Sequence, residues 1–157
     1  MRSAAPASNS SISGSGGNLA FSTSSGTGTR TLNVNGTLSG SFGLQHNVAS
    51  GTLSVGGTTT SGYSGNITLG TASGGTFQVA NGATLVTSGN FTHSWNKTLV
   101  FDGALTTQTA SISTNATTNM SGGGSFTNTG LFLSNNVVLN STMTGTLDTT
   151  SGKVVIG

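Results

Sequence analysis

The chain has 157 residues, of which 32% are hydrophobic, and it carries four basic side chains, two acidic side chains and no cysteine. Nucleic acids and anionic membrane surfaces are recognised by clustered Lys and Arg, and so few scattered charges exclude both as expected partners. The missing cysteine excludes disulfides and thiolate metal sites, and no apolar run reaches the ~18 residues typical of a membrane span. We therefore expect no nucleic-acid binding and no membrane insertion.

Residues 1–17 are rich in Ser, Ala and Gly and show no apolar periodicity. We predict a flexible N-terminal arm over residues 1–17, followed by a single repeat-built all-β domain over residues 18–157. The arm lacks the hydrophobic centre of a signal peptide, so a secreted form is expected to be a mature or trimmed one.

A short motif recurs along this domain, in which Thr begins an alternation of apolar and polar residues that ends at glycine. Such alternation is typical of a strand with one buried face, and glycine permits the turn that follows. No segment shows a convincing helical period. Four copies follow one another at similar intervals, and two weaker copies come after them, the first after a longer step: Thr31-Leu32-x-Val34-x-Gly36, Thr52-Leu53-x-Val55-x-Gly57, Thr76-Phe77-x-Val79-x-x-Gly82, Thr98-Leu99-x-Phe101-x-Gly103, Ser125-Phe126-x-Asn128-x-Gly130 and Thr146-Leu147.

The repeat predicts stacked coils, because one short coil cannot bury its apolar face alone. We expect an all-β fold, a β-solenoid (β-helix) of about six irregular coils. The longer step from Thr98 to Ser125 leaves a β-sandwich or jelly roll as the alternative. In the solenoid, two interior columns would form side by side: Leu32, Leu53, Phe77 and Leu99, and next to them Val34, Val55, Val79 and Phe101.

The rungs GTLSV and TLNVNGTL resemble those of bacterial extracellular β-helix proteins, namely autotransporter passenger domains and filamentous-haemagglutinin-like adhesins. The resemblance covers residues 31–105 best and the remainder loosely. It implies a surface or secreted location and an adhesive or scaffolding role. The chain departs from these proteins in being far shorter and in showing no translocator segment or clear caps.

Side chains suited to catalysis are scarce. Hydrolases and lyases built on β-helices need paired carboxylates or carboxylates with Lys and Arg, whereas this chain has no glutamate. Asp102 and Asp148 fall at different repeat positions and are interpreted as turn and loop residues. His46 and His93 are assigned to unrelated repeat positions, without a carboxylate pair beside either. We predict no enzymatic activity, no cofactor and no metal site.

The segment NFTHSW is the most distinctive local stretch, because Phe91, His93 and Trp95 alternate and would point to one side of a strand. Exposed, they would form a candidate ligand face for surface glycans. The interpretation we favour is that Phe91 and Trp95 fill the interior, since large apolar residues are few.

Asn-x-Ser/Thr sequons are numerous, although a chain so rich in Asn, Ser and Thr is expected to contain several by chance. Those within the predicted domain are potential glycosylation sites: Asn35, Asn66, Asn90, Asn96, Asn115, Asn119 and Asn140.

The ends of a solenoid expose unpaired backbone unless caps cover them. Val154, Val155 and Ile156 form an apolar strand that is a candidate assembly edge, because strand addition to another copy would satisfy both edges. We predict a non-enzymatic extracellular or cell-surface structural protein, a self-assembling fibre subunit or adhesin module whose main partner is itself. A carbohydrate- or surface-binding module, and a virion fibre or decoration protein, are the alternatives.

Overall fold

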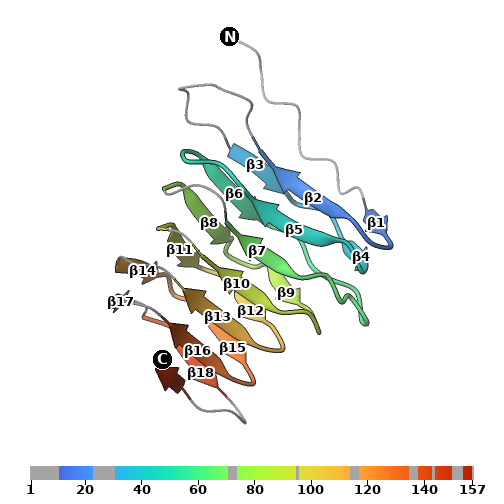
Figure 1. Ribbon diagram of the computed structural model, residues 1–157. Coiled ribbons are helices and arrows are strands. Elements are labelled where there is room, and N and C mark those ends of the chain that lie inside the picture. Colours follow the sequence, from blue (N-terminus) through green and yellow to red (C-terminus); the bar gives the residue numbers. More distant parts are fainter. Residues whose placement is uncertain are drawn as a thin grey trace.

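The computed structural model describes residues 11–22, 31–70, 74–94, 96–113, 117–134, 138–142, 144–149 and 154–156. These residues form nineteen strands joined by turns and loops. Each strand pair is parallel, and the strands wind into a β-solenoid (Figure 1). The predicted β-solenoid is confirmed, with about five turns where about six coils were expected. The alternatives, a sandwich or a jelly roll, are wrong, because both are antiparallel folds. Within the described residues no helix is long and apolar enough to cross a membrane.

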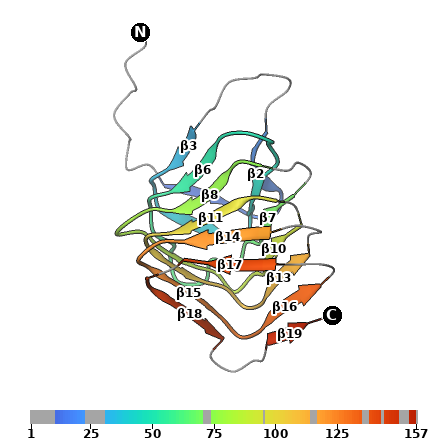
Figure 2. The ribbon, with the colours of Figure 1, turned by 90° about the vertical axis from the view of Figure 1, so that its left-hand side faces the viewer.

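Three sheets make up the faces of the solenoid, and each successive coil adds one strand to a sheet. The seven-stranded sheet lies along the rod in Figure 1 and consists of β2 (Asn18–Phe21), β5 (Gly43–His46), β7 (Ile67–Leu69), β10 (Phe91–His93), β13 (Ala110–Ser113), β16 (Leu131–Ser134) and β19 (Val154–Ile156). The six-stranded sheet runs from top to bottom in Figure 2 and consists of β3 (Thr31–Val34), β6 (Thr52–Val55), β8 (Thr76–Val79), β11 (Thr98–Phe101), β14 (Thr117–Ser121) and β17 (Val138–Ser141).

The third face is less continuous. Its four-stranded sheet consists of β9 (Thr84–Val86), β12 (Ala104–Thr106), β15 (Ser125–Asn128) and β18 (Thr146–Thr149). Towards the N-terminal end, β1 (Ile12–Gly14) pairs with β4 (Leu38–Gly40). Isolated bridges from Leu38 to Thr59 and from Thr58 to Thr84 connect this pair to the four-stranded sheet.

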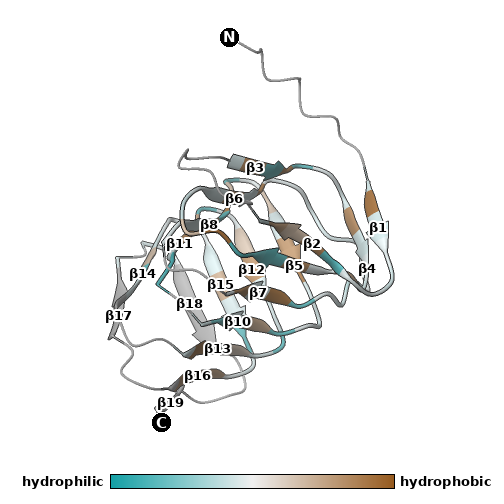
Figure 3. Cartoon of the chain, turned by 45° about the horizontal axis from the view of Figure 1, so that its top comes forward, coloured by the Kyte–Doolittle hydropathy of each residue, from teal (hydrophilic) through white to brown (hydrophobic). Residues whose placement is uncertain are grey.

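The two predicted interior columns are present in the six-stranded sheet. Pairing aligns Leu32, Leu53, Phe77 and Leu99 in one column, and it aligns the neighbouring column two residues further along each strand in the same way. Leu53, Phe77 and Leu99 are at most 1% exposed. Strands of the seven-stranded sheet also carry apolar residues, shown in brown for β7 and β13 in Figure 3. Stacked coils therefore bury the apolar half of each alternation, as expected.

The later coils start at other residues than the motif predicted. In the six-stranded sheet Thr98 pairs with Asn119, and Asn119 pairs with Asn140, so these two asparagines continue the coil starts at a nearly even spacing. Ser125 and Thr146 instead pair in the column of Ala104, in the four-stranded sheet. The assignment of a coil start to Ser125 was wrong for two reasons. The strands of the four-stranded sheet carry the same apolar–polar alternation, and β14 lacks the Thr-Leu pair of the earlier coils.

The solenoid begins earlier than the sequence suggested. Ile12–Gly14, placed in the flexible arm, forms β1 and pairs with Leu38–Gly40 of the next coil. Residues 1–10 lie outside the described part of the chain. The repeat-built domain therefore includes residues before position 18.

Aromatic side chains fill the middle of the interior. Phe126 lies between two rings, with its centroid 5.3 Å from that of Phe91 in an edge arrangement and 4.9 Å from that of Phe101 in a stacked one. Phe77 and Phe91 follow at 6.0 Å. These rings come from all three sheets, and each is fully buried. They join the faces of the rod into one core, since buried aromatic side chains dominate core energetics.

The turn from the six-stranded to the four-stranded sheet is packed too tightly for side chains. We call the residues Gly57, Gly103, Gly124 and Gly145 the glycine corner. A Cβ on Gly124 would overlap the carbonyl oxygen of Gly103, and one on Gly145 would overlap that of Gly124. Glycine at this turn is thus required by the close approach of successive coils.

Candidate functional site

The aromatic segment does not form an accessible ligand face. Phe91 and His93 are both 0% exposed and point into the core from β10. Phe91 contacts Phe77 and Phe126 there. Trp95 lies outside the described residues. Two of the three side chains that were candidates for glycan stacking are therefore enclosed, as the interior interpretation predicted for Phe91.

The two histidines occupy the same interior column, which corrects their assignment to unrelated repeat positions. Strand pairing places them in register with apolar residues of neighbouring coils, in the order Phe21, His46, Leu69, His93 and Ile112. Counting from the repeat motif failed because the interval from Thr31 to His46 is shorter than the interval from Thr76 to His93. The extra residues lie between the strands. They change the number of residues from the motif to the histidine, but they leave the pairing register of the strands unchanged.

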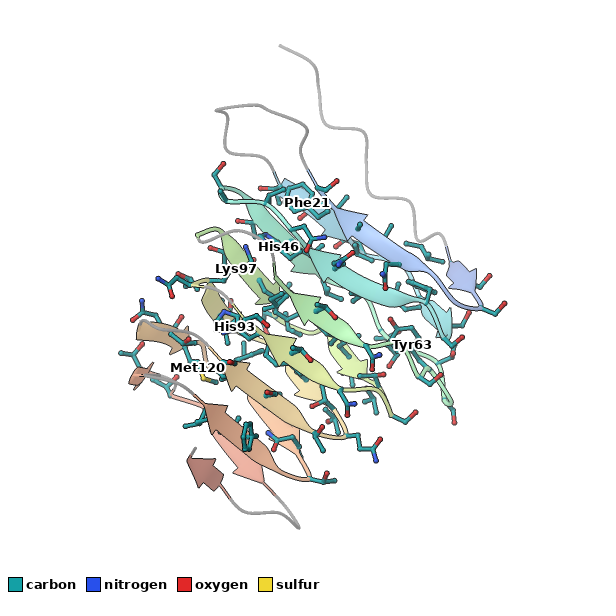
Figure 4. The ribbon with its side chains drawn as sticks, viewed as in Figure 1. Phe21, His46, Tyr63, His93, Lys97 and Met120 are labelled. Atoms are coloured by element: carbon teal, nitrogen blue, oxygen red, sulfur yellow. The ribbon has the colours of Figure 1, made fainter. Side chains whose placement is uncertain are left out.

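Lys97 lies beside this column and is only 2% exposed. We call His46, His93 and Lys97 the basic corner, because they meet where the seven-stranded sheet turns into the six-stranded sheet; Figure 4 shows them on one side of the rod and Tyr63 on the other. The Lys97 Nζ donates hydrogen bonds to the carbonyl oxygens of Val48 at 2.8 Å and Gly74 at 2.9 Å. The lysine thus links its own coil to the two coils before it.

The hydrogen bonds of His93 define its neutral tautomer. The backbone N–H of Lys97 donates to Nε2 of His93 at 3.3 Å, so Nε2 carries no proton. The proton is then on Nδ1, which faces the hydroxyl of Thr118 at 3.5 Å. A neutral imidazole satisfies both neighbours, whereas a doubly protonated one would place two donors against each other.

His46 has a different environment. Neither ring nitrogen has a hydrogen-bond partner, and the side chain is 0% exposed. The ring of Phe21 lies against it, with centroids 5.4 Å apart in an edge arrangement. Gly75, with φ of +77°, passes so close that a Cβ there would lie 2.8 Å from Cε1 of His46. The imidazole is packed as an apolar side chain would be.

Burial lowers the pKa of all three groups of the basic corner. Desolvation, followed by the charge of Lys97, lowers the pKa of His46 and of His93 from 6.5 to about 4. The backbone of Gly51 and that of His46 itself favour the protonated imidazole of His46 and so oppose this lowering of its pKa. Neither makes a hydrogen bond to the ring in its neutral form. Desolvation lowers the pKa of Lys97 from 10.5 to about 8. At neutral pH both imidazoles are therefore uncharged beside a mainly protonated lysine.

The aspartates lie apart from the basic corner. Asp102 follows β11 in the turn that was predicted for it, and its Oδ2 accepts a hydrogen bond from Nε2 of Gln78 at 3.1 Å. Asp148 lies within strand β18 opposite Thr127, so its interpretation as a loop residue was wrong. The described residues contain no group of three or more His, Asp or Glu side chains placed to bind one metal ion.

The potential glycosylation sites are mostly on the surface. Asn35, Asn66, Asn90, Asn96 and Asn119 are exposed. Asn66 and Asn90 also stabilise a corner, since Oδ1 of Asn66 accepts from the backbone N–H of Asn90 at 2.9 Å and Oδ1 of Asn90 accepts from the hydroxyl of Thr109 at 2.8 Å. Asn140 lies in β17, and Asn115 is outside the described residues.

The candidate assembly edge forms the last strand of the seven-stranded sheet. Val154, Val155 and Ile156 make up β19 and pair with Leu131, Phe132 and Leu133 of β16. In the described part of the chain β19 has no neighbour on its other side, and β2 at the opposite end of this sheet pairs only with β5. Among the described strands, one row of backbone donors and acceptors on β19 and one on β2 therefore has no strand partner.

Comparisons of the chain with protein-family models, with curated proteins and with solved structures found no match. The structure supports the β-helix architecture that the resemblance implied.

Proposed function

We propose that the protein is a non-enzymatic extracellular or cell-surface structural protein, a self-assembling fibre subunit or adhesin module built on the stacked strands of the solenoid. The observation that carries this proposal is the form of the two ends of the rod. In the described part of the chain the outermost strands of the rod pair on one side only, namely β1, β2 and β3 at one end and β17, β18 and β19 at the other.

The first coil supports the proposal, because its interior side chains are less buried than their partners in the second coil. Ile12, Leu19 and Leu32 pack against the core but remain partly exposed, whereas the residues paired with them are at most 1% exposed: Leu38, Leu44 and Leu53. A further coil stacked on this end would bury the three side chains. That burial is favourable by about 25 cal/mol per Å² of apolar surface.

Parallel addition of β19 of one copy to β2 of another continues the seven-stranded sheet. The backbone of both edges is then paired, and the apolar columns extend across the joint. The low charge of the chain removes the repulsion that keeps most soluble proteins apart. The adhesive role and the surface location come from the resemblance of the rungs to β-helix adhesins.

Self-association is tested by sedimentation velocity across a concentration series at neutral pH, with negative-stain microscopy of the same samples. We expect rods that lengthen with concentration. Leu32→Lys places a charge on the exposed end of the core and should abolish growth, while Thr31→Lys adds the same charge at the adjacent exposed position and should leave growth intact. Monodisperse monomer at every concentration, or equal growth of both variants, would contradict end-to-end assembly.

A further inference from the structure

The basic corner suggests a pH response, independently of the proposed assembly. We propose that Lys97, His93 and His46 form an acid-sensitive cluster, which holds successive coils together at neutral pH and lets them separate when the imidazoles bind protons. The proposal rests on the geometry of a buried cluster that joins three coils.

The hydrogen bonds that hold these coils together come from Lys97. Its Nζ reaches the carbonyl oxygen of Val48, 49 residues earlier in the chain, and that of Gly74, 23 residues earlier. Val48 follows β5 and Gly74 precedes β8, so one side chain bridges the turns of consecutive coils where sheet pairing is interrupted. These are charge-assisted hydrogen bonds in a buried site, which are stronger than neutral ones.

Protonation of His93 breaks the arrangement that positions this lysine. Nε2 of neutral His93 accepts the backbone N–H of Lys97. Once Nε2 carries a proton, that acceptor is lost, and two N–H groups face each other. The new imidazolium also lies near the Lys97 ammonium, whose charge already acts on it. Separation of the turn that carries Lys97 from β10 relieves both effects.

Protonation of His46 adds to the same strain. Its two ring nitrogens have no partners, and its nearest ring is that of Phe21. A charge placed there is desolvated and is again repelled by Lys97. A buried charge without a counter-ion costs several kcal/mol in general, so the coil opens to hydrate it.

No described acidic group faces the basic corner. The groups against the imidazoles are Thr118, Phe21 and, through strand pairing, Leu69 and Ile112, all of them neutral. Among the described residues, Lys97 is the single charge that acts on either imidazole. Asp102 bonds to Gln78 instead, and Asp148 lies in β18.

The direction and range of the response follow from linkage. Because the folded pKa of each histidine lies below the unfolded value, the stabilisation is fully present above pH 6.5 and is lost as the pH falls towards 4. With no glutamate and two aspartates in the chain, ordinary carboxylate titration contributes little in this range. The acid response of this protein should therefore belong mainly to its histidines.

Urea unfolding at pH 7.5, 5.5 and 4.5, combined with amide hydrogen exchange, tests the proposal. From pH 7.5 to pH 4.5 we expect the unfolding constant to rise on the order of 10- to 100-fold per histidine. After correction for intrinsic exchange rates, protection should be lost first in residues 74–75 and 96–98. The double variant His46→Leu, His93→Gln keeps an apolar group and an acceptor but cannot titrate, so it should flatten the response.

The matched control is Gln45→Leu, Thr92→Gln, which changes the adjacent positions of the same two strands; it should retain the wild-type response. If the double variant does not fold, His46→Leu alone should lose about half of the response on a logarithmic scale. A wild-type protein with the same unfolding constant at pH 7.5 and 4.5, or a histidine variant with the full wild-type response, would overturn the proposal.

Discussion

The glycine corner and the basic corner turn the same chain between sheets with opposite chemistry. At the glycine corner the same small residue recurs in the turns after β6, β11, β14 and β17, where the backbones approach so closely that a Cβ would overlap the preceding coil. At the basic corner His93 and Lys97 come from one coil and His46 from an earlier one, and a single lysine holds the turns together through two carbonyl groups. One corner is stabilised by repetition, whereas the other depends on a contact that occurs once.

This difference determines how each corner fails. A change at the glycine corner acts on backbone spacing and cannot be relieved by a side-chain rotation. A change at the basic corner alters charge and hydrogen bonding, so its effect depends on pH. The two corners should therefore be distinguishable by the size of the stability loss and by whether that loss varies with pH.

The largest effect is expected for Gly124→Ala at the glycine corner. The new Cβ would overlap the carbonyl oxygen of Gly103, which belongs to the backbone of the preceding coil and cannot rotate away. We expect a loss of about 3 kcal/mol in the free energy of unfolding, measured by urea denaturation. Gly123→Ala is the matched control, because its nearest neighbour would be the hydroxyl of Thr144 at 3.7 Å. Equal losses in the two variants would contradict the close-approach explanation.

The basic corner should respond to alkali as well as to acid. The folded pKa of Lys97 is lowered to about 8 from 10.5, so the cost of burying its ammonium is present at neutral pH and is relieved as the pH rises above 8. We expect the free energy of unfolding to rise by about 2 kcal/mol between pH 8 and 10. Lys97→Met should remove this rise. A Lys97→Met curve that still rises like the wild type would assign the effect to another group.

Sequence alone predicted the parts of the molecule that repeat. Leu53, Phe77 and Leu99 stack as expected, because an alternating apolar pattern with a regular period leaves one way to bury all copies together. The prediction failed where the residues changed but the structure did not. In β14 the buried Met120 pairs with Leu99, but Asn119 stands where the earlier coils have Thr, so the Thr-Leu pair is missing and the motif was continued into the wrong sheet.

The basic corner could not be predicted in the same way, because its contacts join turns of unequal length. A signal was nevertheless present in the strands. Leu44 and His46 alternate, as do Phe91 and His93, so each histidine stands at an inward position of its strand. A polar residue at an inward position of the alternation indicates a buried polar group. Nothing in the pattern identifies Lys97 as its neighbour.

A smaller effect is expected at the third corner, on the side of the rod opposite the basic corner (Figure 4). The hydroxyl of buried Tyr63 donates to the carbonyl oxygen of Phe42 at 2.8 Å, and the ring of Phe42 lies against it. Tyr63→Phe keeps the ring contact and removes the donor, at a cost of about 1 kcal/mol. Thermal unfolding of the wild type and of Tyr63→Phe measures this loss of stability. Because burial raises the pKa of Tyr63 to about 12, the wild type should also lose stability above pH 10, and Tyr63→Phe should lose less.

The smallest effect is expected on the outer surface of the six-stranded sheet. Gln78 accepts a hydrogen bond from Ser54 at 3.4 Å and donates one to Asp102 at 3.1 Å, so three coils are joined by side chains, of which Gln78 and Asp102 remain partly exposed. Water competes for these groups, and Gln78→Ala should therefore cost only about 0.3 kcal/mol in urea denaturation. Val100→Ala, at the paired outward position of the next coil, is the control for lost surface packing. A loss from Gln78→Ala that matched the loss from Gly124→Ala would mean that polar rows on the surface stabilise the rod as much as its corners do.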